Sequence, residues 1–575
     1  MFTNNRILGY VFASMMFTAA FLIAACGPAE RTAEPGPGGV APEEKKASLR
    51  PSTSVEVAKE RGGKFTYNEN SAFGNPNDPH LVVTATGRAY SVPVTNWLLK
   101  RDVFKEKQPV VGDLAKSWEV SKDGLTYTFK LREGIKFHNV APVNGREMTS
   151  EDVRYSLRRI MADPELIVEK WKPRFQRRLD LGDVKSIDTP DKYTVVISLK
   201  EPFAPFVDAI AHPGTQILPR EFIEKFPEKI ITEGAIGTGP FMPVEYKNQQ
   251  LATYKKNPDY WKKDSAGGAL PYIDDLNVLY FADPQTALAA FRARNLDFIS
   301  GSAKNHVDSV KKEMPDTQIL TSTSLSLTNF RFNMKYKPFE DVRVRRAIHL
   351  TLDRQQFLDI IAQGEGQASG PVTPKYGELA NTMDWLLSQP GYRHPKDQDI
   401  AEAKRLMKEA GYEDGFAMTA MISTGANAGD WASLLSDQLK PLKITVKPDI
   451  VDYAGQWVPK ATAGEFELSW MSHKVASDAD SVLGAHLLGG APRNYGKFDD
   501  PELNDFIKKQ QRSITVEERR KWAQEAEKRA FEVVPMVFLY DPYSTEMAQP
   551  WVHNVGSLFG EGTGQYVDLT WITKH

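Results

Sequence analysis

The residue types that usually carry out catalysis are scattered along this 575-residue chain and form no catalytic motif. The ten histidines include no His-Glu-x-x-His pair for zinc, and no Gly-x-Ser-x-Gly turn presents a serine nucleophile. His138 ends a predicted strand, but no second histidine or carboxylate recurs at metal-ligand spacing. Gly237-Thr-Gly-Pro240 predicts a tight turn that needs glycine conformations, not a phosphate loop, because no Gly-Lys-Ser/Thr accompanies it. We therefore expect no enzyme, no metal and no cofactor.

Cys26 is the only cysteine, and it ends the one strongly apolar segment, residues 7–26, which follows Arg6. A basic start, an apolar centre and small residues at the end are typical of an export signal. Ile23-Ala-Ala-Cys26 resembles the bacterial lipobox, which implies a signal peptide over 1–25 and a lipid on Cys26. An uncleaved membrane helix and an ordinary buried cysteine are the alternatives. The single thiol also excludes an intramolecular disulfide and a cysteine nucleophile in the body of the chain.

The composition of the chain excludes further functional classes. The chain is 41% hydrophobic and 25% charged with a formal net charge of −2, so it carries no electrostatic signature of nucleic-acid binding. No second segment is apolar for long enough to span a membrane. After the signal, about 550 residues remain, which is too many for one core and predicts two or three packed units.

Local patterns predict a mixed α/β protein after a disordered tether. Residues 26–62 are rich in proline, glycine and charge and cannot bury a core. Beyond them, alternation, turn residues and capping residues predict the following elements: a strand at 63–67, a hairpin at 118–131 around Asp123-Gly124, a helix from Thr149, a strand at 193–199, a helix at 284–294 opened by Asp283, two helices within 342–361 and long helices within 501–533.

Seven motifs occur in an order and at spacings that resemble one protein family. They are 111–138, 149–157, 237–241, 257–261, 330–333, 338–347 and 535–540. Together, over about residues 63–555, they resemble the bacterial extracellular solute-binding proteins of family 5, which serve dipeptide and oligopeptide ABC importers. The resemblance implies a two-lobed α/β periplasmic-binding-protein fold with hinge strands. Lobe one would comprise 63–85, 215–322 and 540–575, the extra subdomain 86–214, and lobe two 323–539.

The resemblance also implies a function outside the cytoplasm. The chain would be a monomeric, membrane-anchored receptor that closes around a peptide-like or other small polar solute. It would then deliver that solute to a permease heterodimer with its ATPases. A ligand sensor or chaperone that uses the same cleft, or an exported hydrolase, are the alternative functions.

In peptide-binding members of the family, a Trp is followed three residues later by an Asp that pairs with the peptide's amino group. Trp470 matches that Trp, but His473 occupies the Asp position, with Lys474 beside it. Asp478 and Asp480 are displaced and are better read as a helix-capping turn. Dipeptide binders also carry an Arg for the ligand carboxylate, and residues 422–430 contain none.

These departures matter because a desolvated ammonium needs a paired charge, and an imidazole beside an ammonium has the wrong sign. We therefore expect that free dipeptides are not selected by their termini. The solute would be a longer peptide held by its backbone, or a glycoside, an opine-like conjugate or an anionic compound. Trp470 and Tyr495 would stack on it, unless they are core residues, and Asn329 and Asn427 would donate hydrogen bonds.

Overall fold

The computed structural model describes residues 55–573 with internal gaps at 70–77, 82–89, 106–107, 168–174, 176, 179, 228–229, 231–233, 248–249, 324–325, 425–426, 475–477 and 556–564. The predicted signal peptide, the lipidation site Cys26 and most of the predicted tether lie outside these residues. No helix in the described part of the chain is long and apolar enough to cross a membrane.

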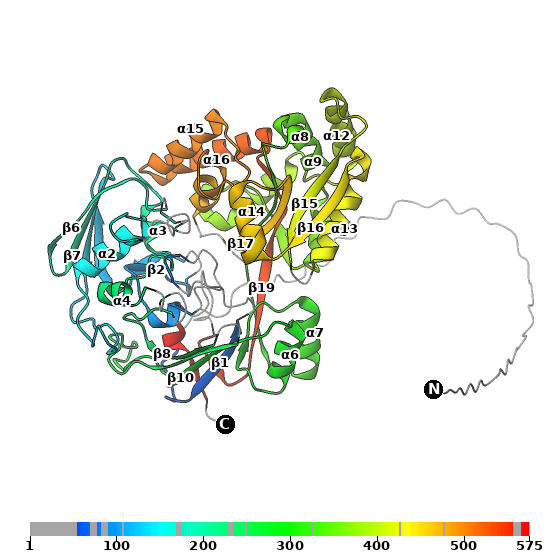
Figure 1. Cartoon of the computed structure of the whole chain (residues 1–575). Helices are drawn as coiled ribbons and strands as arrows, with labels where there is room; N and C mark the ends of the chain where they lie inside the picture. Colours follow the sequence, from blue (N-terminus) through cyan, green and yellow to red (C-terminus); the bar gives the residue numbers. More distant parts are fainter. Residues whose placement is uncertain are drawn as a thin grey trace, which may run out of the picture. The chain divides into compact units, whose positions relative to one another are not determined.

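Three large sheets form the framework (Figure 1). The first sheet has the order β12-β19-β11-β1-β10-β9-β8, with β14 also paired to β19. The second has the order β16-β15-β17-β13-β18, and the third β4-β5-β7-β6. The strands of the first sheet are β1 (Lys64–Glu69), β8 (Phe241–Lys247), β9 (Leu251–Lys256), β10 (Asp275–Tyr280), β11 (Phe298–Ile299), β12 (Gln318–Thr323), β14 (Gly366–Ala368) and β19 (Tyr540–Ala548).

The strands of the second sheet are β13 (Ser326–Phe332), β15 (Ala417–Ser423), β16 (Thr445–Val451), β17 (Leu468–Lys474) and β18 (Met536–Phe538). Those of the third are β4 (Ala115–Val120), β5 (Thr126–Leu131), β6 (Val184–Asp191) and β7 (Thr194–Leu199). Two small pairs join β2 (Leu99–Arg101) to β3 (Val110–Gly112) and β20 (Val552–His553) to β21 (Trp571–Ile572).

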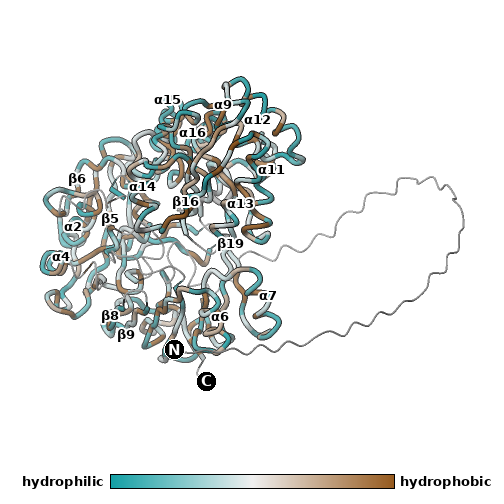
Figure 2. The backbone as a smooth tube through the Cα atoms, turned by 45° about the vertical axis from the view of Figure 1, so that its right-hand side comes forward, coloured by the Kyte–Doolittle hydropathy of each residue, from teal (hydrophilic) through white to brown (hydrophobic). Residues whose placement is uncertain are grey.

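Helices surround these sheets. They are α2 (Ser150–Ile160), α3 (Phe206–Ile210), α4 (Arg220–Lys225), α6 (Pro284–Arg292), α7 (Lys304–Glu313), α8 (Lys337–Glu340), α9 (Val342–Thr351), α10 (Arg354–Ile361), α11 (Met383–Ser388), α12 (Asp397–Glu409), α13 (Ala428–Leu439), α14 (Val458–Ala463), α15 (Pro501–Arg512) and α16 (Val516–Val533). Figure 2 shows hydrophilic residues along the outer helices α7 and α12.

The elements predicted from local chemistry are confirmed. The hairpin is β4–β5, with Val120 opposite Tyr127. The Asp152 carboxylate accepts a hydrogen bond from the Thr149 N–H, and Asp283 accepts from the first N–H groups of α6. Such caps satisfy the donors that a helix start leaves unpaired, which explains why α2 and α6 begin where they do.

The bend at Gly237–Pro240 forms for a reason other than the predicted one. Neither Gly237 nor Gly239 has a positive φ. Instead, a Cβ added at Gly239 would lie 2.4 Å from the carbonyl carbon of Val94, and one at Gly237 would lie 2.6 Å from the Val94 oxygen. Glycine is needed here because two backbones pack against each other.

Two adjacent chain segments connect the first sheet to the second. β12 leads into β13, and β18 leads into β19. β12 pairs antiparallel with β19 from Gln318 opposite Ala548 to Thr323 opposite Tyr543, while β13 pairs with β18. Figure 1 shows β19 running from the second sheet to the first. The fold is therefore two-lobed, with hinge strands between the lobes.

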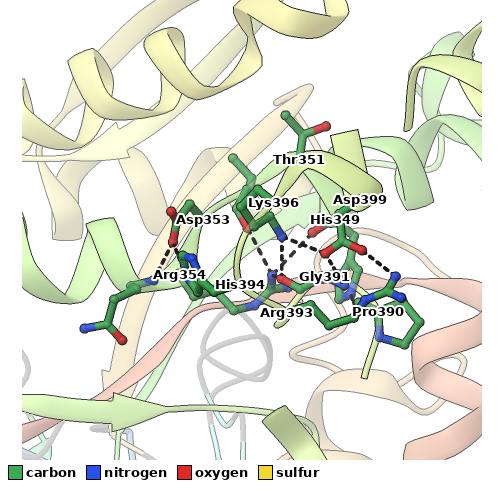
Figure 3. A network of polar contacts seen from close by, with 12 residues as sticks. His349, Thr351, Asp353, Arg354, Pro390, Gly391, Arg393, His394, Lys396 and Asp399 are labelled. Atoms are coloured by element: carbon green, nitrogen blue, oxygen red, sulfur yellow. Dashed lines mark hydrogen bonds and ion pairs between the residues drawn. The ribbon is translucent and has the colours of Figure 1, made fainter. Parts of the chain in front are cut away.

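A buried polar network fixes the second sheet where β18 leads into β19 (Figure 3). The Arg354 guanidinium donates to the Phe538 carbonyl at the end of β18, 2.8 Å away, and to the Gly391 carbonyl at 2.6 Å. Asp399 accepts from the Gly391 N–H and from Lys396 Nζ, both at 3.0 Å. The Arg354 guanidinium therefore ties the end of β18 to the start of α10 and to the loop at Gly391.

Candidate functional site

The carboxyl ends of the parallel strands in the two sheets face each other across the two connecting segments, β12 to β13 and β18 to β19. In the first sheet, β1, β10, β11 and β12 run parallel. In the second, β15, β16 and β17 run parallel, and β18 shares their direction because β13 is antiparallel to both β17 and β18. β12 leaves the first sheet at its carboxyl end, and β18 leaves the second sheet in the same way. Ligands of open α/β sheets bind at such carboxyl edges.

Trp470 lies on the helix-covered face of the second sheet, beside the crossing. Its ring centroid is 4.8 Å from that of Trp431 in α13, which also stacks on Phe357 and on Tyr540, the first residue of β19. Trp470 is half-buried, and its buried Nε1 has no hydrogen-bond partner. A buried N–H without an acceptor is costly. Trp470 therefore offers a free donor next to the hinge.

Asn329 and Tyr495 lie on the opposite face of the same sheet, where they surround Arg331. The Asn329 Oδ1 accepts from Arg331 Nε at 3.1 Å, and its Nδ2 lies 3.4 Å from the Met471 carbonyl. The Arg331 guanidinium lies over the Tyr495 ring at 5.4 Å, and Tyr495 meets Trp457 edge-on at 5.8 Å. Burial raises the pKa of the Tyr495 hydroxyl. Their contact with a solute remains a prediction.

Asn427 and His473 complete the predicted set. Asn427 is exposed at the start of α13, one turn before Trp431, and its Nδ2 lies 3.4 Å from the Ile361 carbonyl. His473 belongs to β17 opposite Leu327, but its side chain lies outside the described part of the structure. The sheet therefore places Trp470 and Asn427 on one side, and Asn329 and Tyr495 on the other.

Arg331 is a central residue of this region that the sequence analysis did not single out. It is 1% exposed, and within the described chain no carboxylate pairs with it. Instead it donates to the Arg493 carbonyl at 2.8 Å and bonds His486 Nδ1 at 2.9 Å. Burial lowers the pKa of its guanidinium to about 10, so it is charged at neutral pH. The sequence signal that could have identified this residue is an arginine placed within the apolar alternation of β13.

The capping turn predicted after β17 is confirmed. Asp478 accepts from the Asp480 N–H at 2.8 Å and pairs with Arg519 at 2.6 Å. Burial, together with the nearby Asp478, raises the pKa of Asp480 to about 7. These aspartates hold the chain that follows β17.

One edge of β17 is open. The strand pairs with β13 along its whole length, from Leu468 to Lys474. On its other side it pairs with β15 only at Leu468 and Ser469. For Trp470 to Lys474 no strand pairing occurs on that side among the described residues. An extended chain could add there by backbone hydrogen bonds.

Elsewhere in the described chain the chemistry is structural. A hollow of about 270 Å³ is lined by α2, α4 and their neighbours, and its four arginines are each paired with a carboxylate. His138 is fully buried: Nε2 bonds the Gly239 carbonyl at 3.0 Å, and Nδ1 accepts from the Gly237 N–H at 3.4 Å. No group of three His, Cys, Asp or Glu side chains in the described ranges could hold a metal.

The profile of the bacterial extracellular solute-binding proteins, family 5, matches residues 109–492. Di/tripeptide-binding protein 2 of Pseudomonas aeruginosa is 30% identical over 455 residues, covering 75% of this chain and 81% of the relative. Heme-binding protein A of Haemophilus influenzae is 28% identical over 475 residues, covering 78% and 82%. This chain belongs to family 5 of the bacterial extracellular solute-binding proteins.

Solved structures agree on the fold. The binding protein AgaA of A. tumefacien R10, in complex with agropinic acid, is 25% identical with a TM-score of 0.77, covering 89% of this chain and 99% of that one. DppA of Helicobacter pylori, in complex with the peptide STSA, is 23% identical with a TM-score of 0.77, covering 90% and 99%. The chain is thus an extracytoplasmic solute-binding protein and not an enzyme.

Proposed function

We propose that this protein is the substrate-binding receptor of an ABC importer, held at the membrane through a lipid on Cys26. It closes lobe one (63–85, 215–322 and 540–575) and lobe two (323–539) around its solute and presents the closed form to the permease and its ATPases. A solute that touches both lobes only in the closed state binds that state more tightly, so binding shifts the equilibrium towards closure. Two hinge segments and facing carboxyl edges suit this motion.

The open edge of β17 carries the proposal for the solute. An extended peptide laid along Trp470–Lys474 would gain backbone hydrogen bonds, and the free Trp470 Nε1 would donate to it. Relatives named for di- and tripeptides support a peptide-like ligand. The binding protein solved with agropinic acid keeps an anionic conjugate open as the other class.

Free dipeptides should bind poorly, because two charge anchors are missing. His473 occupies the position that resembles the amine-pairing Asp of peptide-binding family members, and residues 422–430 contain no Arg. A buried ammonium without a counter-charge costs several kcal/mol. We therefore expect that blocking the amino group of a peptide leaves its affinity within about threefold, whereas removing backbone N–H groups by N-methylation lowers it.

A thermal-shift experiment on the full chain tests this with four probes: Ala-Ala, tetra-alanine, N-acetyl-tetra-alanine and agropinic acid. A ligand at a hundred times its Kd stabilises the fold by about 2.7 kcal/mol, a shift of a few degrees. Equal responses to free and acetylated tetra-alanine support backbone recognition. A response to Ala-Ala and tetra-alanine with none to N-acetyl-tetra-alanine would contradict it. A response to agropinic acid alone would move the solute to the conjugate class.

Trp470→Phe then tests the site itself. The variant keeps an aromatic ring against Trp431 and removes the unpaired Nε1 donor of Trp470, so affinity for the responding probe should fall about five- to tenfold. Trp522→Phe is the matched control, because Trp522 stacks on Phe506 between α15 and α16. Equal affinity in both variants would place the solute away from Trp470.

A further inference from the structure

The extra subdomain touches lobe two directly, away from the hinge. Its residues 201–204 meet the carboxyl end of α15. The Ala204 N–H donates to the Gln511 carbonyl at 2.6 Å, and Glu201 pairs with Arg512. Beside them, Ile514 reaches the tip of the β4–β5 hairpin, where a Cβ added at Gly124 would lie 3.8 Å from its Cγ1. Ile514 is 63% exposed, so this contact is a rim and not part of a core.

A second tie lies deeper between the same two parts. Asp180 of the extra subdomain pairs with Arg493 of lobe two at 2.6 Å, and their side chains are 23% and 14% exposed. Asp180 also accepts from Arg177 at 2.9 Å. The carbonyl of Arg493 accepts from the buried Arg331 of β13. The tie therefore reaches the second sheet.

The extra subdomain is in turn fixed to the first sheet's lobe. Lys262, which follows β9, pairs with the fully buried Asp113 beside β3, and Trp261 Nε1 donates to Asn96 at 3.4 Å. The hinge segments join the two lobes at one place. The contacts between the extra subdomain and lobe two join them at another. The lobes cannot separate unless the pairs Glu201–Arg512 and Asp180–Arg493 and the Ala204–Gln511 bond all break.

We propose that Glu201, Arg512, Asp180 and Arg493, with the Ala204–Gln511 backbone bond, form a latch that holds the closed form of the receptor. The proposal rests on the proposed function only for the use of closure, because the contacts themselves are seen directly in the structure. The exposed Glu201–Arg512 pair is weak and salt-sensitive, which suits a contact that must open and reclose, while the more buried Asp180–Arg493 pair is screened less by salt.

The latch is linked to the chain that follows β17. The Gln511 side chain donates to Asp480 at 2.9 Å, and Asp480 lies in the turn capped by Asp478. Gln511 thus bonds the extra subdomain through its carbonyl and the turn after β17 through its amide. Movement of β17 on binding a solute is passed to the latch through this one residue.

Hydrogen exchange at the Ala204 amide reads the latch directly, on the full chain with no solute added. Arg512→Gln and Glu201→Gln should each speed exchange about two- to fivefold, and 1 M NaCl should do the same to the wild type. The double variant should match the single ones, because either substitution removes the same pair. Arg493→Gln should also speed exchange at Ala204 if the two ties act together.

Two further variants separate a latch from ordinary surface stabilisation. Exchanging the charges, in Glu201→Arg with Arg512→Glu, should restore protection. Arg405→Gln removes an equally exposed arginine that pairs only within α12, and it should leave Ala204 unchanged. Unchanged exchange in Arg512→Gln and Arg493→Gln overturns the proposal. This readout needs no ligand, so failure of the solute screen and failure of the latch are distinguished.

Discussion

At the scale of single residues, Asp478 and Asp480 are two buried carboxyls with opposite roles. Asp478 faces Arg519, and burial of the pair is compensated by its ionic contact. Asp480 accepts from the amides of Gln510 and Gln511, and burial together with Asp478 raises its pKa from 3.8 to about 7. A carboxyl with a raised folded pKa contributes stability below about pH 3.8, which is lost as the pH rises through about 7.

Asp480→Asn should therefore stabilise the protein at pH 8 by about 2–4 kcal/mol, because the amide keeps an acceptor for both glutamines and carries no charge. The gain should fall below about 1 kcal/mol near pH 4, where Asp480 is protonated in the folded state and close to half protonated in the unfolded chain. Asp478→Asn is the matched control and should destabilise by about 3–5 kcal/mol, since it leaves Arg519 buried without its partner. Urea unfolding at pH 4, 6 and 8 measures both. A gain that persists at pH 4 would contradict this assignment.

The candidate site was only partly predictable at this scale. Motif position was enough to select Trp470 on its own. Its free Nε1, and the placement of Asn329 and Tyr495 on the other face, depend on which residues oppose each other across β13 and β17. The alternation of residue types along a strand predicts that neighbouring side chains lie on opposite faces of the sheet, but it does not predict which face packs against the helices. Arg331 was missed because its acceptors, a carbonyl and an imidazole, come from residues 486–493.

At the scale of elements, close backbone packing makes Gly239 irreplaceable. Gly239→Ala would bring a Cβ to 2.4 Å from Val94 and 2.5 Å from the Thr95 nitrogen, so the 93–95 segment must move. We expect a loss of about 2–4 kcal/mol. Gly429→Ala is the control: Gly429 lies in α13, a Cβ there meets nothing within 4 Å, and the change should stabilise by about 0.5–1 kcal/mol. Thermal midpoints that shift equally in both variants would show that packing at Gly239 is unimportant.

Elements were predictable where their signals are local. The caps at Thr149 and Asp283 and the turn at Asp123-Gly124 each act within four residues, and each predicted element is confirmed. The pairing of those elements is not local. Asn329 opposes Met471, and Phe298 opposes both Tyr67 and Ala548. Hydrophobic patterns are compatible with many such pairings, so the two-lobed fold was expected from the family resemblance alone, and the strand order within each sheet was not predicted.

At the scale of the whole molecule, two neutral histidines lie at the joints between its parts. His138 joins the third-sheet region to the Gly237–Pro240 bend, and His80 Nε2 bonds the Gln216 carbonyl at 2.8 Å. Burial lowers the pKa of each imidazole from 6.5 to about 4. Between about pH 4 and pH 6.5, these two histidines bind protons in the unfolded chain but not in the folded chain. Stability from these groups is present above about pH 6.5 and is lost as the pH falls towards 4.

His138→Gln should therefore flatten the dependence of stability on pH. Each histidine contributes a slope of up to about 1.4 kcal/mol per pH unit, so the variant should lose about 2 kcal/mol less than the wild type between pH 6.5 and 5. Asp480 titrates in the same window with the opposite sign, so the difference between the two proteins, and not the wild-type curve alone, isolates His138. Gly239→Ala damages the same contact without removing a titrating group, so its curve should run parallel to the wild type. If the His138→Gln curve also runs parallel, then the acid sensitivity of this joint does not come from the imidazole.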